Sequence, residues 1–341
     1  MKSSLKQYLK QAFFSQTVII WFTVWSGLFW SSASLTSSAN EEIEVPTGKE
    51  VVEILNRDDS RGFFRLTGIV ESFNRKGLIL KTTDGEKTIA AHLVKKVHYR
   101  KSEEQKLGEL HFQQKNFRDA LSHFKKSLAA ADRRWIEVEI MEKIIQCETA
   151  LAFYSQAVTD FLALEELEPE MTDSTFSCIP LAWQAIPGDS QIEGTARKLL
   201  SANGKSPTAV LLCGSYLLFS SEGKEIEKRL KLLAENREAR IARLAQAQTW
   251  RLELMNLTTE KITQWQTALE SFPPEFRGGP DFIVGQAFLR LNDFDPAALA
   301  FLKCAWVYGV DPLLTKEALK QAQKALELGG HSDEAQKIKV D

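Results

Sequence analysis

The chain has 341 residues, of which 44% are hydrophobic and 26% are charged. At about 150 residues per domain, this length predicts two or three structural units, and the composition is typical of a globular protein with a real core. Forty-three basic and 45 acidic residues give a net charge of −2. Since no basic field covers the chain, the charge does not favour nucleic acid as a partner.

The first 39 residues differ from the remainder and predict an export signal. Their charge comes entirely from three lysines, Lys2, Lys6 and Lys10. An apolar run over 17–30 follows, and small residues after it allow cleavage behind Ala33 or Ala39, as in a secretory signal peptide. We therefore expect the protein to be exported, to the periplasm and cell envelope or beyond, with a tether over 40–48.

Two alternatives to cleavage remain open at this N-terminal segment. The run over 17–30 would span about 21 Å as a helix, less than the roughly 30 Å of a bilayer core. Extended back to Ala12, it approaches the length of an uncleaved signal anchor, and residues 12–30 would then associate with a membrane. A buried core helix is the second alternative.

Residues 49–100 have the pattern of short strands. Apolar runs alternate with turn signals, and Asp84-Gly85 stands between two of these runs, which is typical of a two-residue hairpin. Four or five strands in about 50 residues predict a small antiparallel β module, an SH3-like or Sm-like barrel.

From Lys101 onward the periodicity is helical. We expect helical repeats over 101–171, an irregular connector over 172–193 and further helices over 194–275, before a last group over 276–341. Ser206-Pro207 predicts a helix start, because serine caps the first turn and proline at the first helical position has no N–H to satisfy.

Two segments share one spacing of small and aromatic residues. In each, a glycine is followed after nine residues by an aromatic, after 12 by an alanine and after 16 by a second aromatic. The positions are Gly108, Phe117, Ala120 and Phe124 in the first segment, and Gly285, Phe294, Ala297 and Phe301 in the second. This spacing resembles the tetratricopeptide repeat (TPR), whose helices pair and stack into an α-solenoid.

The resemblance is looser elsewhere. Residues 138–166 match through Tyr154, Ala157 and Phe161 but have Ile145 in place of the glycine, and residues 315–339 match through Gly330 and Ala335. The middle of the chain, 172–275, is not a regular array of this repeat and resembles a general α-solenoid. The whole layout also resembles exported repeat proteins of planctomycete-type bacteria.

The TPR resemblance implies a protein or peptide partner held in a concave groove, which the first helix of each pair lines. Carried onto this sequence, it predicts eight partner-binding positions: Gln105, Glu109, Phe112 and Gln113 in the first repeat, and Phe282, Gln286, Leu289 and Arg290 in the later one. The lysine–asparagine clamp of chaperone-binding members is missing, because Gln105/Glu109 and Phe282/Gln286 occupy its places. The implied function is a non-catalytic interaction scaffold.

Sequence motifs for catalysis, metal binding or nucleotide binding are weak. The four cysteines show no CxxC spacing and three lie in apolar helical patterns, which favours buried thiols over disulfides or zinc. Gly204-Lys205-Ser206 lacks the first glycine of a phosphate-binding loop. We expect no catalytic residues, no metal site and no cofactor. The alternative function is a structural envelope protein that spaces or oligomerises, its β module docking to wall or membrane.

Overall fold

The computed structural model describes residues 43–56, 62–184, 190–309 and 311–340. The chain divides into two compact units, Met1–Glu44 and Val45–Asp341, and every element named below belongs to the second unit. The export signal predicted over 1–39 lies outside the described residues and stays a prediction. In the ranges that the structure describes, no helix is long and apolar enough to cross a membrane.

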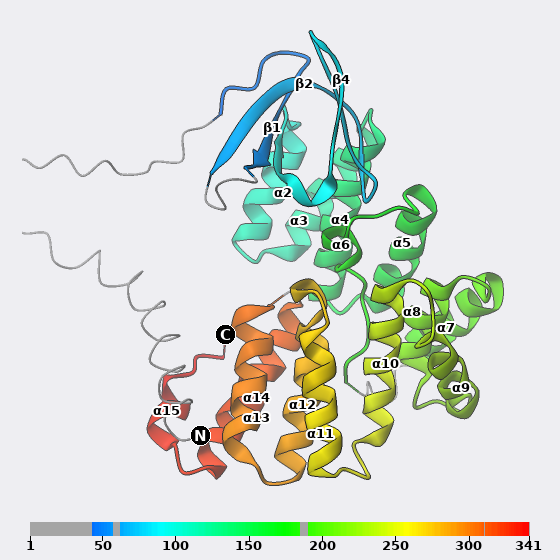
Figure 1. Cartoon of the computed structure of the whole chain (residues 1–341), viewed down its shortest axis with the longest axis vertical. Coiled ribbons are helices and arrows are strands. Elements are labelled where there is room, and N and C mark those ends of the chain that lie inside the picture. Colours follow the sequence, from blue (N-terminus) through cyan, green and yellow to red (C-terminus); the bar gives the residue numbers. More distant parts are fainter. Residues whose placement is uncertain (1–42, 57–61, 185–189, 310, 341) are drawn as a thin grey trace, which may run out of the picture. The chain divides into compact units, whose positions relative to one another are not determined.

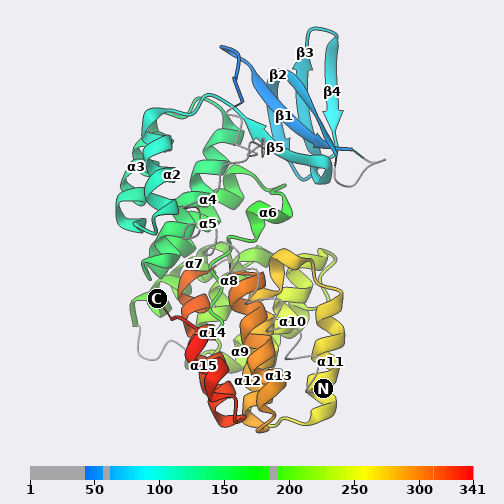
Figure 2. The same cartoon turned by 90° about the vertical axis from the view of Figure 1, so that its left-hand side faces the viewer.

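The second unit begins with a five-stranded antiparallel sheet, part of which is labelled in Figure 1. Its strand order is β4-β3-β2-β1-β5, and Figure 2 labels all five strands. The strands are β1 (Glu50–Leu55), β2 (Phe63–Asn74), β3 (Gly77–Thr82), β4 (Gly85–Ile89) and β5 (Val94–His98). Alternate residues of a strand face one side, and this side buries Val52, Ile54, Val70, Leu78 and Leu80. The small antiparallel β module is confirmed, and its last strand returns to pair with its first.

Two-residue loops join β2 to β3 and β3 to β4. The second loop consists of Thr83 and Asp84, because Thr82 pairs with Gly85 across the hairpin. The predicted hairpin therefore exists, but Gly85 begins β4 instead of lying inside the turn. The first loop consists of Arg75 and Lys76, and both residues border a cleft.

The helical part consists of hairpins of consecutive helices, several of which are seen side by side in Figure 2. Its α-helices are α2 (Glu103–Gln113), α3 (Phe117–Ala129), α4 (Arg134–Ala150), α5 (Tyr154–Leu167), α6 (Asp173–Phe176), α7 (Ser190–Asn203), α8 (Pro207–Leu217), α9 (Gly223–Leu233), α10 (Ala239–Glu253), α11 (Thr259–Glu270), α12 (Gly278–Arg290), α13 (Phe294–Leu302), α14 (Pro312–Leu328) and α15 (Ser332–Lys337). Shorter turns are the 3₁₀ helices η1 (Ala91–Leu93) and η2 (Pro274–Phe276) and the π-helix η3 (Lys303–Val307). Helix α8 starts as predicted, because the Ser206 side chain accepts from the Ala209 N–H at 3.2 Å.

The same turn joins the helices of four hairpins, α2–α3, α4–α5, α12–α13 and α14–α15. Two residues before each second helix, the backbone is left-handed, with φ of 59°, 59°, 57° and 80° at Lys115, Ala152, Asn292 and Gly330. The next N–H donates to the carbonyl five residues back, at 2.9, 2.8, 3.0 and 2.8 Å. This is the Schellman ending of a helix. The four hairpins thus share one turn geometry, and they include both loosely matching segments.

The repeat glycines lie where the second helix of a hairpin presses on the first. A Cβ atom at Gly108 would stand 2.8 Å from the ring of Phe124, and one at Gly285 would stand 2.8 Å from the ring of Phe301. Both rings are fully buried. Only a residue without a side chain allows this approach, so these two hairpins pack as the TPR resemblance predicts.

The middle helices α7 to α11 form hairpins of a different kind. Among their described residues, none has the left-handed turn of the four repeated hairpins. The fold is therefore mainly α-helical and irregular at its centre, as expected from the missing repeat spacing there.

Before these helices, the connector carries the short helix α6 and then an extended stretch whose polar backbone is satisfied by side chains. The Tyr216 hydroxyl donates to the Pro180 carbonyl at 2.6 Å, and the Ala182 N–H donates to Ser215 at 3.0 Å. Gln248 donates to the Ala182 carbonyl at 3.2 Å. Since a buried backbone needs such partners, helices α8 and α10 hold the connector in place.

The β module and the first helices share one hydrophobic core. Buried residues of β1, β2 and β3 belong to the same cluster as residues of α3 and α4. At its edge the Trp135 indole N–H donates to the Val70 carbonyl at 3.1 Å. The carboxylate of Glu50, only 2% exposed, accepts from Arg133 at 2.5 Å and from the Val70 N–H at 2.7 Å. These contacts fix the sheet against α4.

Candidate functional site

The polar positions predicted on α2 do not form one open surface. Gln105 is 3% exposed and donates its side-chain amide to the hydroxyl of Tyr99. Glu109 accepts from Lys101. Gln113 is exposed at the end of the helix. Gln105 is therefore buried and already hydrogen-bonded, whereas the Gln113 side chain is open to solvent.

The two aromatic positions differ in burial, and only Phe112 retains exposed surface. Phe112 is half-buried, with its ring centroid 5.5 Å from that of Phe117 and 6.4 Å from that of Phe124. Phe282 is 0% exposed and packs edge-on against Phe301 at 5.5 Å. The Phe282 ring is therefore a core side chain and is not offered to a partner, a correction to its predicted role.

The remaining positions on α12 lie at the surface. Leu289 is half-buried, and Arg290 is exposed and donates to the Leu254 carbonyl and to Met255 Sδ, both at 3.2 Å. Gln286 and Arg290 border a cavity of about 430 Å³, the α10–α12 cavity. Its lining residues are Trp183, Gln184, Phe219, Arg251, Leu252, Leu254, Met255, Gln286 and Arg290.

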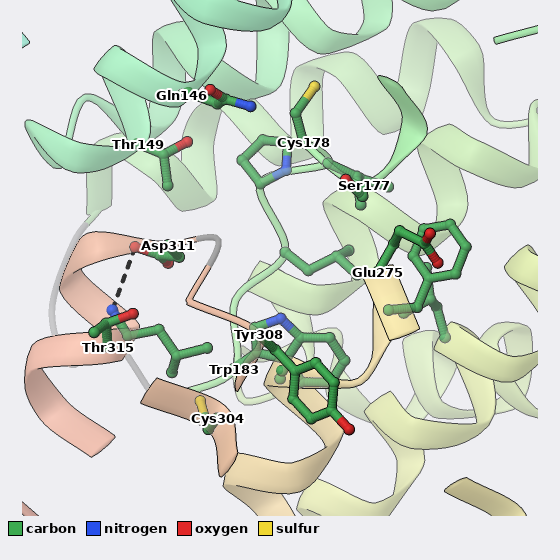
Figure 3. Close-up of a pocket in the computed structure, with 18 residues that line it drawn as sticks. Gln146, Thr149, Ser177, Cys178, Trp183, Glu275, Cys304, Tyr308, Asp311 and Thr315 are labelled. Carbon is green, nitrogen blue, oxygen red and sulfur yellow. Dashed lines mark hydrogen bonds between the residues drawn. The ribbon is translucent and has the colours of Figure 1, made fainter. Parts of the chain in front are cut away.

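A small cavity of about 80 Å³ lies between the connector, the end of α4 and the start of α14 (Figure 3). Cys178 and Cys304 both border it, and burial raises the pKa of each thiol well above its usual value. A Cβ atom at Gly279 would stand 1.9 Å from the Trp183 indole, so this tryptophan fills the space against α12. The cavity has room for little more than water and is part of the packing.

A larger cleft of about 760 Å³ lies beside strand β5, and we call it the β5 cleft. Four consecutive β5 residues, 94–97, border it. Since side chains alternate along a strand, four consecutive lining residues indicate that the strand edge itself faces the cleft. β5 stands at the end of the strand order, and among the described strands it pairs with β1 alone.

The two walls of the β5 cleft carry opposite charges. The sheet side and its continuation provide Arg75, Lys76, Lys95, Lys96 and Lys101. The helical side provides Glu139, Glu142, Glu168, Asp173 and Glu275. Between the walls, apolar surface comes from Phe73, Val94, Val97, Trp135, Val138 and Met171.

Ion pairs link basic residues of the cleft to the helical part of the chain. Arg75 binds Glu170 at 3.0 Å and Glu238 at 3.1 Å. The pKa of the Glu170 carboxyl is lowered, because Arg75 and Lys76 donate to it. Across the cleft, Lys101 lies 3.5 Å from Glu139.

Other charged groups of both signs in the lining are exposed or half-buried. Lys96 is exposed and borders the cleft. On the opposite wall, burial raises the pKa of the half-buried Glu142 carboxyl.

The described residues include no group of three or more His, Cys, Asp or Glu side chains that could hold a metal ion. The side chains of the cleft provide ionic groups, a strand edge and apolar patches. Such a set supports recognition of another chain through its backbone and charges.

Comparisons with known proteins add little to this geometry. No protein-family model matches the chain, and no curated protein matches it. A solved structure described as the TPR2AB-domain:pHSP90-complex of yeast Sti1 is similar, with 16% identity over 69% of this chain and 97% of that chain and a TM-score of 0.21. The repeat assignment therefore rests on the four Schellman turns and the two glycine–phenylalanine contacts.

The β5 cleft could not be predicted from the sequence. Its residues come from segments as far apart as Phe73 and Glu275, and no motif connects them. One signal existed, the pair Lys95-Lys96 inside an apolar strand, since inward or edge lysines are common on exposed strand edges.

Proposed function

We propose that this protein is a non-catalytic interaction module of the cell envelope, which binds an extended segment of a protein partner in the β5 cleft. The observation that carries the proposal is the open edge of β5 along a cleft of about 760 Å³. An extended segment that pairs with a strand edge gains main-chain hydrogen bonds, while flanking side chains determine which segment is accepted.

The charges on the two walls indicate which kind of segment the cleft would accept. A segment with acidic residues on the sheet side and basic residues on the helical side would neutralise both walls, and apolar residues between them would meet Val97 and Trp135. The helical hairpins hold α4 against the sheet and so keep the second wall in position. The envelope location rests on the N-terminal pattern over 1–39, which predicts export.

Affinity capture with the full chain tests this function. We expect Lys96→Glu to reduce recovery of a specific partner at least tenfold, because it reverses an exposed charge in the cleft without breaking a described ion pair. The matched control is Lys87→Glu on β4, an exposed lysine of the opposite edge strand. Equal recovery with both variants contradicts binding in the cleft.

The structural alternative has one observation in its favour. Phe63 and Phe64 at the start of β2 are 41% and 49% exposed, and exposed aromatics on a sheet are suited to docking on another surface. Retention on isolated wall or on vesicles that is lost in Phe64→Ser, with no discrete partner captured, would favour that function.

A further inference from the structure

The α10–α12 cavity contains a buried positive charge that no described side chain neutralises. Arg251 is 4% exposed, and none of the nine residues lining the cavity is acidic. Among the described residues, the guanidinium has only neutral hydrogen-bond acceptors, and no carboxylate affects its pKa. A buried charge without an opposite charge is costly, so this arginine favours an anion beside it.

The hydrogen bonds of Arg251 hold it in place without cancelling its charge. Nη1 donates to the Ser215 carbonyl at 2.8 Å and to Gln248 Oε1 at 2.6 Å, and Nη2 donates to the Gln184 carbonyl at 3.0 Å. All three acceptors are neutral. The guanidinium is thus fixed in orientation before any ligand arrives, which lowers the entropy that binding would cost.

A second cation and an amide stand across the same cavity. Arg290 is exposed and held by neutral acceptors, the Leu254 carbonyl and Met255 Sδ. Gln286 lies one turn before Arg290 on the same face of α12 and also borders the cavity. Two arginines and an amide therefore converge from α10 and α12.

The rest of the cavity is apolar and partly open. Phe219 is 54% exposed and Met255 is 77% exposed, both unusual for large apolar side chains. The Arg251 guanidinium lies 5.1 Å from the centre of the Phe219 ring. An apolar group bound here would cover surface that is otherwise wet.

From this arrangement we propose that the α10–α12 cavity binds a carboxylate that carries an apolar group, with the carboxylate at Arg251 and Arg290 and the apolar group against Phe219 and Met255. The cavity volume of about 430 Å³ falls within the usual range for small-ligand sites. The carboxylate comes either from a free amphiphilic acid or from the end of a peptide chain. This site is separate from the β5 cleft and does not depend on the function proposed there.

The charge state of Arg251 also favours the binding of a carboxylate. Burial lowers the pKa of Arg251 to about 10, so the guanidinium still carries its charge at neutral pH. A bound carboxylate would raise this pKa again, because the opposite charge stabilises the protonated form. Acid binding should therefore persist from the ligand's own pKa through neutral pH.

Calorimetric titration of the full chain tests the proposal with two matched pairs of probes. Octanoate is compared with octanol, and N-acetylphenylalanine with its amide, so each pair differs in the carboxylate alone. We expect at least one acid to bind more than tenfold tighter than its neutral partner. Preference for octanoate identifies a free acid as the natural class, and preference for N-acetylphenylalanine identifies a chain end.

Variants place the binding in this cavity. Arg251→Gln should abolish acid binding, and Arg290→Ala, at an exposed position, should weaken it about tenfold. Arg237→Ala is the control, since it removes an exposed arginine just before α10 and outside the cavity. The proposal is overturned if neither acid binds, if the neutral probes bind as tightly, or if Arg290→Ala and Arg237→Ala leave acid binding equally strong.

Discussion

The glycine of a repeat hairpin offers the sharpest test of how these helices pack. A Cβ atom at Gly285 would stand 2.8 Å from Cδ1 and Cε1 of Phe301, whereas carbon atoms in good contact are about 3.5–4.0 Å apart. Relieving an overlap of this kind typically costs about 1–3 kcal/mol. Alanine recovers about 1 kcal/mol through its higher helix propensity. Gly285→Ala should therefore destabilise the protein by up to about 2 kcal/mol.

A second helical glycine provides the matched control. Gly194 lies within α7, and nothing stands within 4 Å of a Cβ atom built on it. The higher helix propensity of alanine is then not offset by a steric clash. Gly194→Ala should therefore stabilise the protein by about 0.5–1 kcal/mol. Equilibrium urea unfolding, followed by far-ultraviolet circular dichroism, measures both changes. The two variants should move the midpoint in opposite directions.

A double variant connects the effect to one contact. Phe301→Leu removes the ring edge that the new methyl group meets, so the cost of Gly285→Ala should be smaller in that background, with a coupling free energy of about 1 kcal/mol. If Gly285→Ala and Gly194→Ala stabilise the protein alike, or if Phe301→Leu leaves the cost unchanged, the helices of this hairpin do not meet as described.

Three further predictions concern export, a core ring and a buried carboxyl. N-terminal sequencing of the envelope form should begin near Ser34 or Asn40, and a soluble cytoplasmic pool with intact Met1 would contradict export. Phe282→Ser should cost about 3–5 kcal/mol in urea unfolding, as for other buried phenylalanines; unchanged stability would restore its predicted groove role. Burial raises the pKa of Glu148 to about 7 although Lys125 donates to this carboxylate at 2.9 Å, so wild type should lose stability as the pH rises from about 4.5 to 7, where the carboxyl ionises more easily in the unfolded chain. Glu148→Gln should abolish that loss, and identical pH profiles would refute the assignment.

The repeated hairpins could be predicted because their information is local. A glycine, an alanine and two aromatics recur at one spacing, and in a helix that spacing determines which side chains meet. Gly108 and Gly285 therefore indicate the close helix contacts through their spacing alone. The same holds for the β module, where apolar runs and turn residues alternate over a few residues, and for the start of α8 at Pro207.

The turn that the four hairpins share could not be predicted from the sequence, for a conformational reason. Lys115 and Ala152 adopt a left-handed backbone that glycine or asparagine normally marks. Such residues give no sequence signal, because the conformation is imposed by the helices that flank them. The predicted hairpin at Asp84-Gly85 shows the opposite case, in which a strong signal identified the turn but strand register shifted its position by one residue.

Tertiary structure alone decided the sites. Arg251 stands in the sequence as one more charge on an amphipathic helix, and it becomes a buried cation because the connector carbonyl of Gln184 needs a donor there. Phe282 occupies a family groove position but is enclosed, and its ring packs against Phe301 of α13. Exposure and charge balance depend on neighbours far away along the chain. The sequence thus determined the helical hairpins and the strands, while the packing between them determined which side chains face a ligand.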